Sequence, residues 1–206
     1  MRYLRYSLLL LLGACASAYK GLTPVAVDPV CTARLAPRGL GTAWYTTSVD
    51  VIGKHISGLL LVKQMPDSST RVVFTNEAGV TFFDFAFAAD GTFSARQVIK
   101  QLNKKPVVET LRKDFALVLG LPFRNGAWHA WKEGDEVYYG VAQKKETAYF
   151  ITGPDCASLR RLETGSRRKR KVTVERTGSN ALLPDTIVVR HHTFAMTISL
   201  RKLERP

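Results

Sequence analysis

The sequence has few carboxylates, few cysteines and no long apolar segment. Its 17 Asp and Glu residues stand against 30 Lys and Arg, which gives the 206-residue chain a formal net charge of +13. The strongest apolar run covers only residues 8–12, far short of the roughly 18 residues that a membrane-spanning helix needs. No internal repeat or heptad pattern appears. With 46% hydrophobic and 23% charged residues, the composition is that of a globular chain and excludes a disordered one.

Motifs of the common enzyme classes are also missing. The sequence contains no H-E-x-x-H, no G-x-S-x-G, no P-loop and no G-x-G-x-x-G after a strand. His191 and His192 are adjacent on a predicted strand, so their rings point to opposite faces and do not easily share a metal ion. We therefore expect no enzyme, no metal site and no cofactor. One enzymatic alternative stays open, a cysteine hydrolase in which Cys156 lies beside one of these histidines.

The first residues have the order of an export signal. Basic residues, the leucine run and a group of small residues follow one another, as in a secretory signal peptide. The tetrapeptide LGAC, which ends at Cys15, resembles the lipobox of bacterial lipoproteins. It predicts that residues 1–14 are removed and that Cys15 carries a lipid anchor. Cleavage after Ala18, at the A-x-A pattern ASA, is the alternative and would leave a soluble protein without that cysteine.

An exported basic protein meets acidic partners at membranes. Phospholipid headgroups or envelope glycolipids are the expected partners, and nucleic acid is not expected. Ala16 follows Cys15, and no acidic residue precedes Asp28, so neither an inner-membrane retention aspartate nor an acidic surface-export tag is present. The expected location is the periplasmic face of the outer membrane in a bacterial cell envelope.

One basic cluster is the run RRKRK, with two arginines across the same predicted hairpin. It predicts a patch that is attracted to anionic membranes. The alternative is a solvated edge hairpin whose charge prevents association between sheets. The patch residues are Arg160, Arg161, Arg167, Arg168, Lys169, Arg170 and Lys171.

The two other cysteines are Cys31 and Cys156. They are able to pair in an oxidising compartment, but the sequence does not report their separation in space and leaves the disulfide open. Residues 15–41 contain three prolines and little periodicity. This composition predicts a lipidated start followed by a flexible tether.

From residue 42 the pattern is one of hairpins, with alternating apolar residues separated by turn sequences such as Asp-Gly. The period then changes, and residues 105–119 place apolar side chains at helical spacing with Pro106 in the first turn. Together with residues 96–102, this predicts two short helices, or one helix broken at 103–105. Strands return afterwards. The expected fold class is mainly β with a helical insertion (α+β).

One face of the predicted sheet is thoroughly apolar, and the helix has an apolar stripe of its own. A strongly curved sheet can leave a hollow beneath such a helix, and hollows of this kind hold lipid-like ligands. An ordinary solid core is the alternative. The candidate residues of an acyl-chain pocket are Leu60, Val62, Phe74, Phe83, Phe85, Phe87, Val108, Leu111, Phe115 and Leu119.

The segments SGLLLVKQM, RVVFTNEAGVTFFDF and LPDTIVVRHHTFAMTISLRKLE, with the lipobox and the central helix, resemble the LolA/LolB-like superfamily. The resemblance implies an incomplete antiparallel β-barrel, a half-barrel, whose helices cover the open mouth. It implies that residues 42–206 form a LolB-like domain that binds acyl chains or lipoproteins during transfer to the outer membrane. The lipid-anchored receptor of that family carries an exposed leucine on a protruding loop, whereas the loop MPDSST has none.

The rival hypothesis is an envelope lipoprotein that does not transport. Such a protein would act as a structural or partner-binding module with a solid core. Its interaction face would be an aromatic hairpin formed by Trp128, Trp131, Tyr138 and Tyr139.

Overall fold

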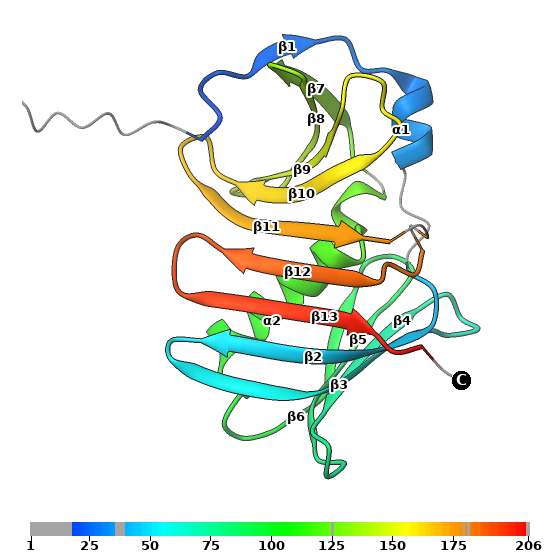
Figure 1. The fold of residues 1–206 in the computed structure, drawn as a ribbon, viewed down its shortest axis with the longest axis vertical. Coiled ribbons are helices and arrows are strands. Elements are labelled where there is room, and N and C mark those ends of the chain that lie inside the picture. Colours follow the sequence, from blue (N-terminus) through cyan, green and yellow to red (C-terminus); the bar gives the residue numbers. More distant parts are fainter. Residues whose placement is uncertain (1–17, 36–39, 125, 179, 181, 205–206) are drawn as a thin grey trace, which may run out of the picture.

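The computed structural model describes residues 18–35, 40–124, 126–178, 180 and 182–204. In that part of the chain, a single antiparallel sheet of 13 strands curls around one long helix (Figure 1). The strand order is β1-β7-β8-β9-β10-β11-β12-β13-β2-β3-β4-β5-β6, and the outermost strands do not pair with each other. The sheet is therefore an open half-barrel, and the predicted fold class is confirmed.

The strands are β1 (Thr23–Val25), β2 (Ala43–Val51), β3 (Lys54–Gln64), β4 (Thr70–Thr75), β5 (Thr81–Phe87), β6 (Phe93–Val98), β7 (Trp128–Glu133), β8 (Glu136–Ala142), β9 (Thr147–Thr152), β10 (Leu159–Gly165), β11 (Arg170–Thr177), β12 (Thr186–His191) and β13 (Met196–Lys202). The helices are α1 (Pro29–Leu35), α2 (Lys105–Val118) and the short 3-10 helix η1 (Leu121–Phe123). Within the described ranges, no helix is both long enough and apolar enough to cross a membrane.

Alternation along the strands separates a concave apolar face from an outer face. In β5, Phe83, Phe85 and Phe87 are buried, while the residues between them are partly exposed. Strand β3 repeats the pattern, with Leu60 and Val62 buried. The concave face of the half-barrel is thus built by the period-2 pattern that the sequence contains.

Helix α2 crosses this concave face and covers the open side of the half-barrel (Figure 1). Pro106 lies in its first turn, and Leu111, Phe115 and Val118 are buried beneath it. The chain leaves the helix through Gly120, whose φ of +70° is a left-handed conformation that glycine adopts without strain.

The prediction of a second helix before α2 is wrong. Residues 96–98 belong to β6, which pairs with the outer side of β5. Without β6, the backbone N–H and C=O groups on that side of β5 would lack partners. This pairing outweighs a weak helical pattern of only two turns.

The N-terminal strap, residues 18–35, was expected to belong to a flexible tether, and this expectation is wrong. Strand β1 pairs with β7, and α1 follows it directly. Asp28 begins α1, because its Oδ1 accepts a hydrogen bond from the backbone N–H of Val30 at 2.8 Å. Pro24 lies on an edge strand and Pro29 at a helix start, two positions where proline is tolerated. Prolines at these positions therefore do not indicate a tether.

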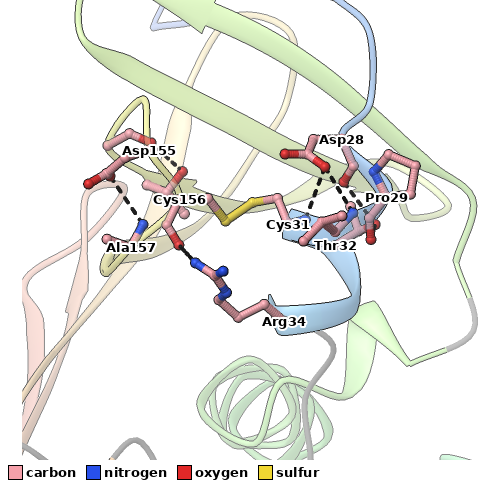
Figure 2. The surroundings of a disulfide bond; sticks show 11 residues. Asp28, Pro29, Cys31, Thr32, Arg34, Asp155, Cys156 and Ala157 are labelled. Carbon is pink, nitrogen blue, oxygen red and sulfur yellow. Dashed lines mark hydrogen bonds between the residues drawn. A yellow bond between two sulfur atoms is a disulfide. The ribbon is translucent and has the colours of Figure 1, made fainter.

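A disulfide fastens the N-terminal strap to the loop between β9 and β10 (Figure 2). Cys31 of α1 is bonded to Cys156, and their Cα atoms are 5.9 Å apart. Arg34 of the same helix donates a hydrogen bond from Nη1 to the carbonyl oxygen of Cys156 at 3.2 Å. Both cysteines are buried. The bond consumes the thiol that a cysteine hydrolase would use as its nucleophile.

Candidate functional site

An apolar pocket of about 230 Å³ lies between the N-terminal half of α2 and the concave face of the sheet. Among its described lining residues, Thr110 alone has a polar side chain, and its Oγ1 donates to the carbonyl of Pro106 at 2.9 Å. The pocket therefore offers no unpaired polar group to a ligand. Its lining consists of Val49, Val51, Ile52, Ile56, Phe74, Phe83, Leu102, Pro106, Val107, Thr110, Leu111, Phe194 and Met196.

The rim of the pocket is built by two turns. Ile52 lies in the tight turn between β2 and β3, and Phe194 in the turn between β12 and β13. Their exposed fractions are 75% and 39%, which are high for large apolar side chains. Strands β13 and β2 place the two turns side by side, because Met196 is opposite Val51. The pocket thus opens towards solvent between exposed apolar residues.

Three of the ten predicted pocket residues, Phe74, Phe83 and Leu111, line this pocket. The others fill the core around it. Phe83 stacks on Phe85 with ring centroids 4.4 Å apart and contacts Phe115 at 5.6 Å. Aromatic side chains thus occupy part of the space beneath α2. The remaining predicted residues lie in that core cluster or pack against it: Leu60, Val62, Phe85, Phe87, Val108, Phe115 and Leu119.

Sequence reasoning missed the residues nearest to the opening. Ile52 and Phe194 lie in turns, and apolar residues in turns carry no periodicity. Val49, Val51 and Ile56 do alternate along β2 and β3. This alternation could have identified the three residues as part of the apolar face. The register of the strands, which places Ile56 opposite Val49, then brings them together.

Solved structures of other proteins have a similar architecture. A LolA superfamily protein from Nitrosomonas europaea superposes with a TM-score of 0.51 and 9% identity, covering 87% of this chain and 93% of that one. The chain has a LolA-like fold. At this identity the similarity concerns the fold alone.

Two other solved structures are similar to a lesser degree. An outer membrane lipoprotein-sorting protein domain from Vibrio parahaemolyticus has a TM-score of 0.49 at 7% identity, covering 83% of this chain and 87% of that one. A DUF1329 family protein from Desulfovibrio piger has a TM-score of 0.48 at 8% identity, covering 86% and 92%. The sequence matches no protein-family model and no curated protein.

Two polar contacts hold α2 against the sheet of the LolA-like fold. Arg176 of β11 points to the concave side and donates a hydrogen bond from Nη2 to the carbonyl of Val118, in the last turn of α2. Burial lowers the pKa of Arg176 to about 10. The Tyr45 hydroxyl is also buried there, and neither it nor Arg176 Nε has a hydrogen-bond partner among the described residues. A charged group in an apolar interior is costly, so this contact is a weak point in the attachment of α2.

The second contact is a buried pair at the rim. Asp114 Oδ2 of α2 lies 2.9 Å from Nε2 of His191, and the side chains are 2% and 5% exposed. Burial raises the pKa of the Asp114 carboxyl, an effect that His191 partly opposes. The His191 ring also contacts Phe194, with centroids 4.5 Å apart. His192 instead contacts Thr173 Oγ1 at 2.8 Å, so the two histidines do point to opposite faces.

The predicted basic patch is not one surface, because carboxylates bind several of its members. Glu163 is fully buried and forms ion pairs with Arg161 Nε at 2.6 Å and with Arg170 Nε at 2.9 Å. Its Oε2 also accepts a hydrogen bond from the Tyr19 hydroxyl at 3.0 Å. Arg161 contacts Glu136 as well, which holds the pKa of that carboxyl below its usual range. These arginines stabilise the N-terminal strap and β8 against β10.

Arg160 and Lys171 are paired too. Arg160 Nη2 lies 2.7 Å from Asp135 Oδ2, at the start of β10 and far along the strand from the turn at residues 166–169. Lys171 Nζ lies 2.7 Å from Glu146 Oε1. A run of charges in the sequence does not reveal the carboxylates that neighbouring strands bring beside it. Residues 167–169 form an exposed basic turn.

The aromatic hairpin of the rival hypothesis is largely covered. Tyr138 and Tyr139 are buried, and Tyr138 packs with Tyr149 and Trp131 beneath the N-terminal strap. Trp128 stacks on Phe123, with ring centroids 5.5 Å apart. In the described part of the chain, no group of three His, Cys, Asp or Glu residues is placed to hold a metal ion.

Proposed function

We propose that this protein is an envelope carrier that binds the acyl chain of a lipid or lipoprotein between α2 and the concave face of the sheet. The observation that carries the proposal is the apolar pocket, whose one polar side chain, Thr110, is satisfied within its own helix. Such a lining accepts hydrocarbon and discriminates against polar ligands. The LolA-like fold supports the proposal, since the same architecture occurs in a LolA superfamily protein.

The size of the pocket sets what it holds. At about 230 Å³ it is smaller than the roughly 300–1,000 Å³ of most small-molecule sites, so it takes the end of one chain. A longer chain requires that α2 move away from the sheet, which would separate Phe115 of the helix from Phe83 of β5 and open the aromatic core. Each buried CH₂ group contributes about 0.8 kcal/mol, so insertion of several carbons offsets the loss of these contacts. Binding is then a passive exchange that involves no catalyst.

The proposed location is the periplasmic face of the outer membrane. The signal peptide of residues 1–14 and the lipid anchor at Cys15 lie outside the described residues and remain predictions from the sequence. The disulfide between Cys31 and Cys156 supports an oxidising compartment. The folded unit is larger than the proposed domain of 42–206, because the N-terminal strap is part of it.

Displacement of a fluorescent fatty acid tests the proposal. The full chain with Cys15→Ser binds the probe, and Val107→Trp, which fills the pocket from the surface of α2, weakens binding by about tenfold or more. Val30→Trp is the matched control, because Val30 is 68% exposed on α1 and does not line the pocket. It leaves binding unchanged. Absence of probe binding, or equal binding by the Val107 variant, would refute the proposal and favour a solid structural module.

A further inference from the structure

The loops of this sheet divide into two groups with opposite charge. Because neighbouring strands are antiparallel, the loops that follow β2, β4, β6, β8, β10 and β12 leave the sheet at one end. The loops that follow β3, β5, β7, β9 and β11 leave it at the other end. In Figure 1, the turns after β2, β10 and β12 lie one above another at the left side of the sheet.

The first group of loops is strongly cationic, and we call it the basic end. Its loops contain seven Lys and Arg residues but two carboxylates, Glu77 and Glu146. Glu146 is already paired with Lys113 and Lys171. The seven cations are all exposed: Lys100, Lys104, Lys144, Lys145, Arg167, Arg168 and Lys169.

The second group is the acidic end. Each of its five loops contributes one exposed aspartate, and none contains Lys or Arg in the sequence. These aspartates are Asp67, Asp90, Asp135, Asp155 and Asp185. Asp135 is paired with Arg160 and Asp185 with Lys202, so the excess of negative charge rests on the other three. A chain with an excess of basic residues has thus placed the aspartates of these loops at one end and their lysines and arginines at the other. The half-barrel therefore has an electrostatic direction.

The basic end is also where the pocket opens. Ile52 and Phe194, the exposed rim residues, belong to two of its loops. Ile52 has a φ of +46°, a left-handed conformation that is unfavourable for a β-branched residue and common for asparagine. An exposed isoleucine at this turn position is explained by neither local conformation nor burial. A smaller hollow lined by His191, Phe194, Lys171 and Glu146 continues from the rim to the loop after β8, so the surface is contiguous.

The chain also enters the described structure at this end. The backbone N–H of Ala18 donates to the carbonyl oxygen of Arg168, in the loop after β10, at 3.3 Å. Cys15 lies outside the described residues, and in the sequence it precedes Ala18 by three residues. A lipid on Cys15 would hold the basic end close to the membrane without a long stalk.

We propose that the basic end is the surface by which this protein contacts an anionic phospholipid bilayer. The lysines and arginines of its loops bind the headgroup phosphates, and Ile52 and Phe194 reach into the boundary between headgroups and acyl chains. The aspartates of the acidic end are repelled by the same surface and fix the orientation. The pocket mouth then faces the acyl region directly. Contact of this kind does not require that the pocket hold a chain.

Sedimentation with lipid vesicles tests the charged part of the surface. The full chain with Cys15→Ser, which lacks the anchor, is mixed with vesicles of phosphatidylglycerol and phosphatidylcholine and with vesicles of phosphatidylcholine alone. Binding to the anionic vesicles is expected and weakens in salt. Lys144→Glu with Lys145→Glu weakens it by about 30-fold or more. Equal binding to both vesicle types would overturn the proposal.

The matched control reverses two exposed lysines at the other end, Lys63 and Lys132. Lys63→Glu with Lys132→Glu makes the same change in net charge, but these residues are held away from the membrane. Binding to anionic vesicles therefore changes by less than about threefold. If both double variants lose binding equally, net charge and not the basic end is responsible, and the proposal is wrong.

Tryptophan fluorescence tests the apolar part of the same surface. Ile52→Trp is expected to show a blue-shifted emission when anionic vesicles are added, because the side chain enters the bilayer. Leu182→Trp is the control, since Leu182 is 43% exposed in the loop after β11 at the acidic end. Its emission stays unchanged. Equal shifts at both positions, or none at Ile52, would contradict the orientation. Fatty-acid displacement measured on the same proteins reports separately on the pocket.

Discussion

Arg176 of β11 donates a hydrogen bond across the interior of the half-barrel to the carbonyl of Val118, the last residue of α2. It is a polar contact between the sheet and the C-terminal end of the covering helix, where Phe115 and Val118 are buried in the core. The guanidinium is buried, and its Nε has no hydrogen-bond partner among the described residues. This contact therefore combines one hydrogen bond with the cost of a desolvated cation.

Arg176→Met is expected to loosen the end of α2 without unfolding the protein. Replacing a buried cation by an apolar side chain of similar length is often neutral, so the free energy of unfolding changes by less than about 1–2 kcal/mol. The Val118 carbonyl loses its partner, so hydrogen exchange at amides in the last turn of α2 becomes faster.

Arg190→Met is the control for this substitution. Arg190 lies on the neighbouring strand β12 and is exposed. Its Nη1 forms a long ion pair with Glu175 Oε1, at 3.8 Å. Exchange in α2 stays as in the parent protein. Equal exchange rates in the Arg176 variant and the parent would show that Arg176 does not hold the helix.

Asp114 gives the stability a pH dependence of known sign. Burial raises the pKa of its carboxyl above the ordinary value of 3.8. A raised pKa means that the folded state binds this proton more tightly than the unfolded state, so the contribution is full below pH 3.8 and is lost as the pH rises through the folded pKa. Asp114→Asn removes this contribution, and urea unfolding measured from pH 4 to 7 shows less loss of stability with rising pH.

Asp67→Asn is expected to change the pH dependence of stability with the opposite sign. Hydrogen bonds from Ser69 lower the pKa of the Asp67 carboxyl, so its contribution is present at neutral pH and lost on acidification. The two variants therefore change the slope of stability against pH in opposite directions, Asp114→Asn above pH 3.8 and Asp67→Asn below it, where unfolding is measured from pH 2 to 4. Parallel slopes for the Asp114 variant and the parent protein would show that the buried pair with His191 has no influence on folding.

Much of the fold was predictable because the alternation is regular. Phe83, Phe85 and Phe87 alternate so clearly that the concave face follows from β5 alone. The prediction of a flexible tether was wrong, because Pro24 and Pro29 lie at positions where proline fits regular structure. Strand β1 in this segment pairs with β7, which lies more than a hundred residues later in the chain, and local composition does not predict so distant a partner.

The candidate site was predicted only in part, for a different reason. Leu111 and Phe115 follow the helical period and were foreseen, whereas Asp114 and Arg176 are charged residues that a pattern assigns to solvent. Asp114 is buried against His191, and the partly buried Arg176 meets a helix carbonyl, and both partners are brought there only by folding. Such contacts become visible only when the register of the strands is known.

Glu163 is expected to hold the N-terminal strap in place. It is fully buried and contacts Arg161, Arg170 and Tyr19. Glu163→Gln lowers the free energy of unfolding by about 2–3 kcal/mol, because hydrogen bonds to a charged group are lost and the arginines remain. Glu175→Gln, at an exposed pair on β11, lowers it by less than about 1 kcal/mol. Equal losses in urea unfolding would contradict the buried cluster.

The disulfide is expected to stabilise the folded state by restricting the unfolded chain. Cys31→Ser with Cys156→Ser removes it together with both thiols and lowers the free energy of unfolding by about 2–4 kcal/mol. Proteolysis then cleaves first near α1, which loses its covalent attachment to the loop after β9. Unfolding curves that are unchanged under oxidising conditions would show that α1 is held by other contacts alone.

Photo-crosslinking with a fatty acid that carries a diazirine near its methyl end tests the account most directly. After irradiation and digestion, the account predicts labelled peptides from the pocket lining, at Val51 and Met196 on the sheet and at Val107 on α2. Excess unlabelled fatty acid and the variant Val107→Trp both abolish this labelling. Label on the β7–β8 hairpin instead, or no label that competes with fatty acid, would contradict an acyl-chain site beneath α2.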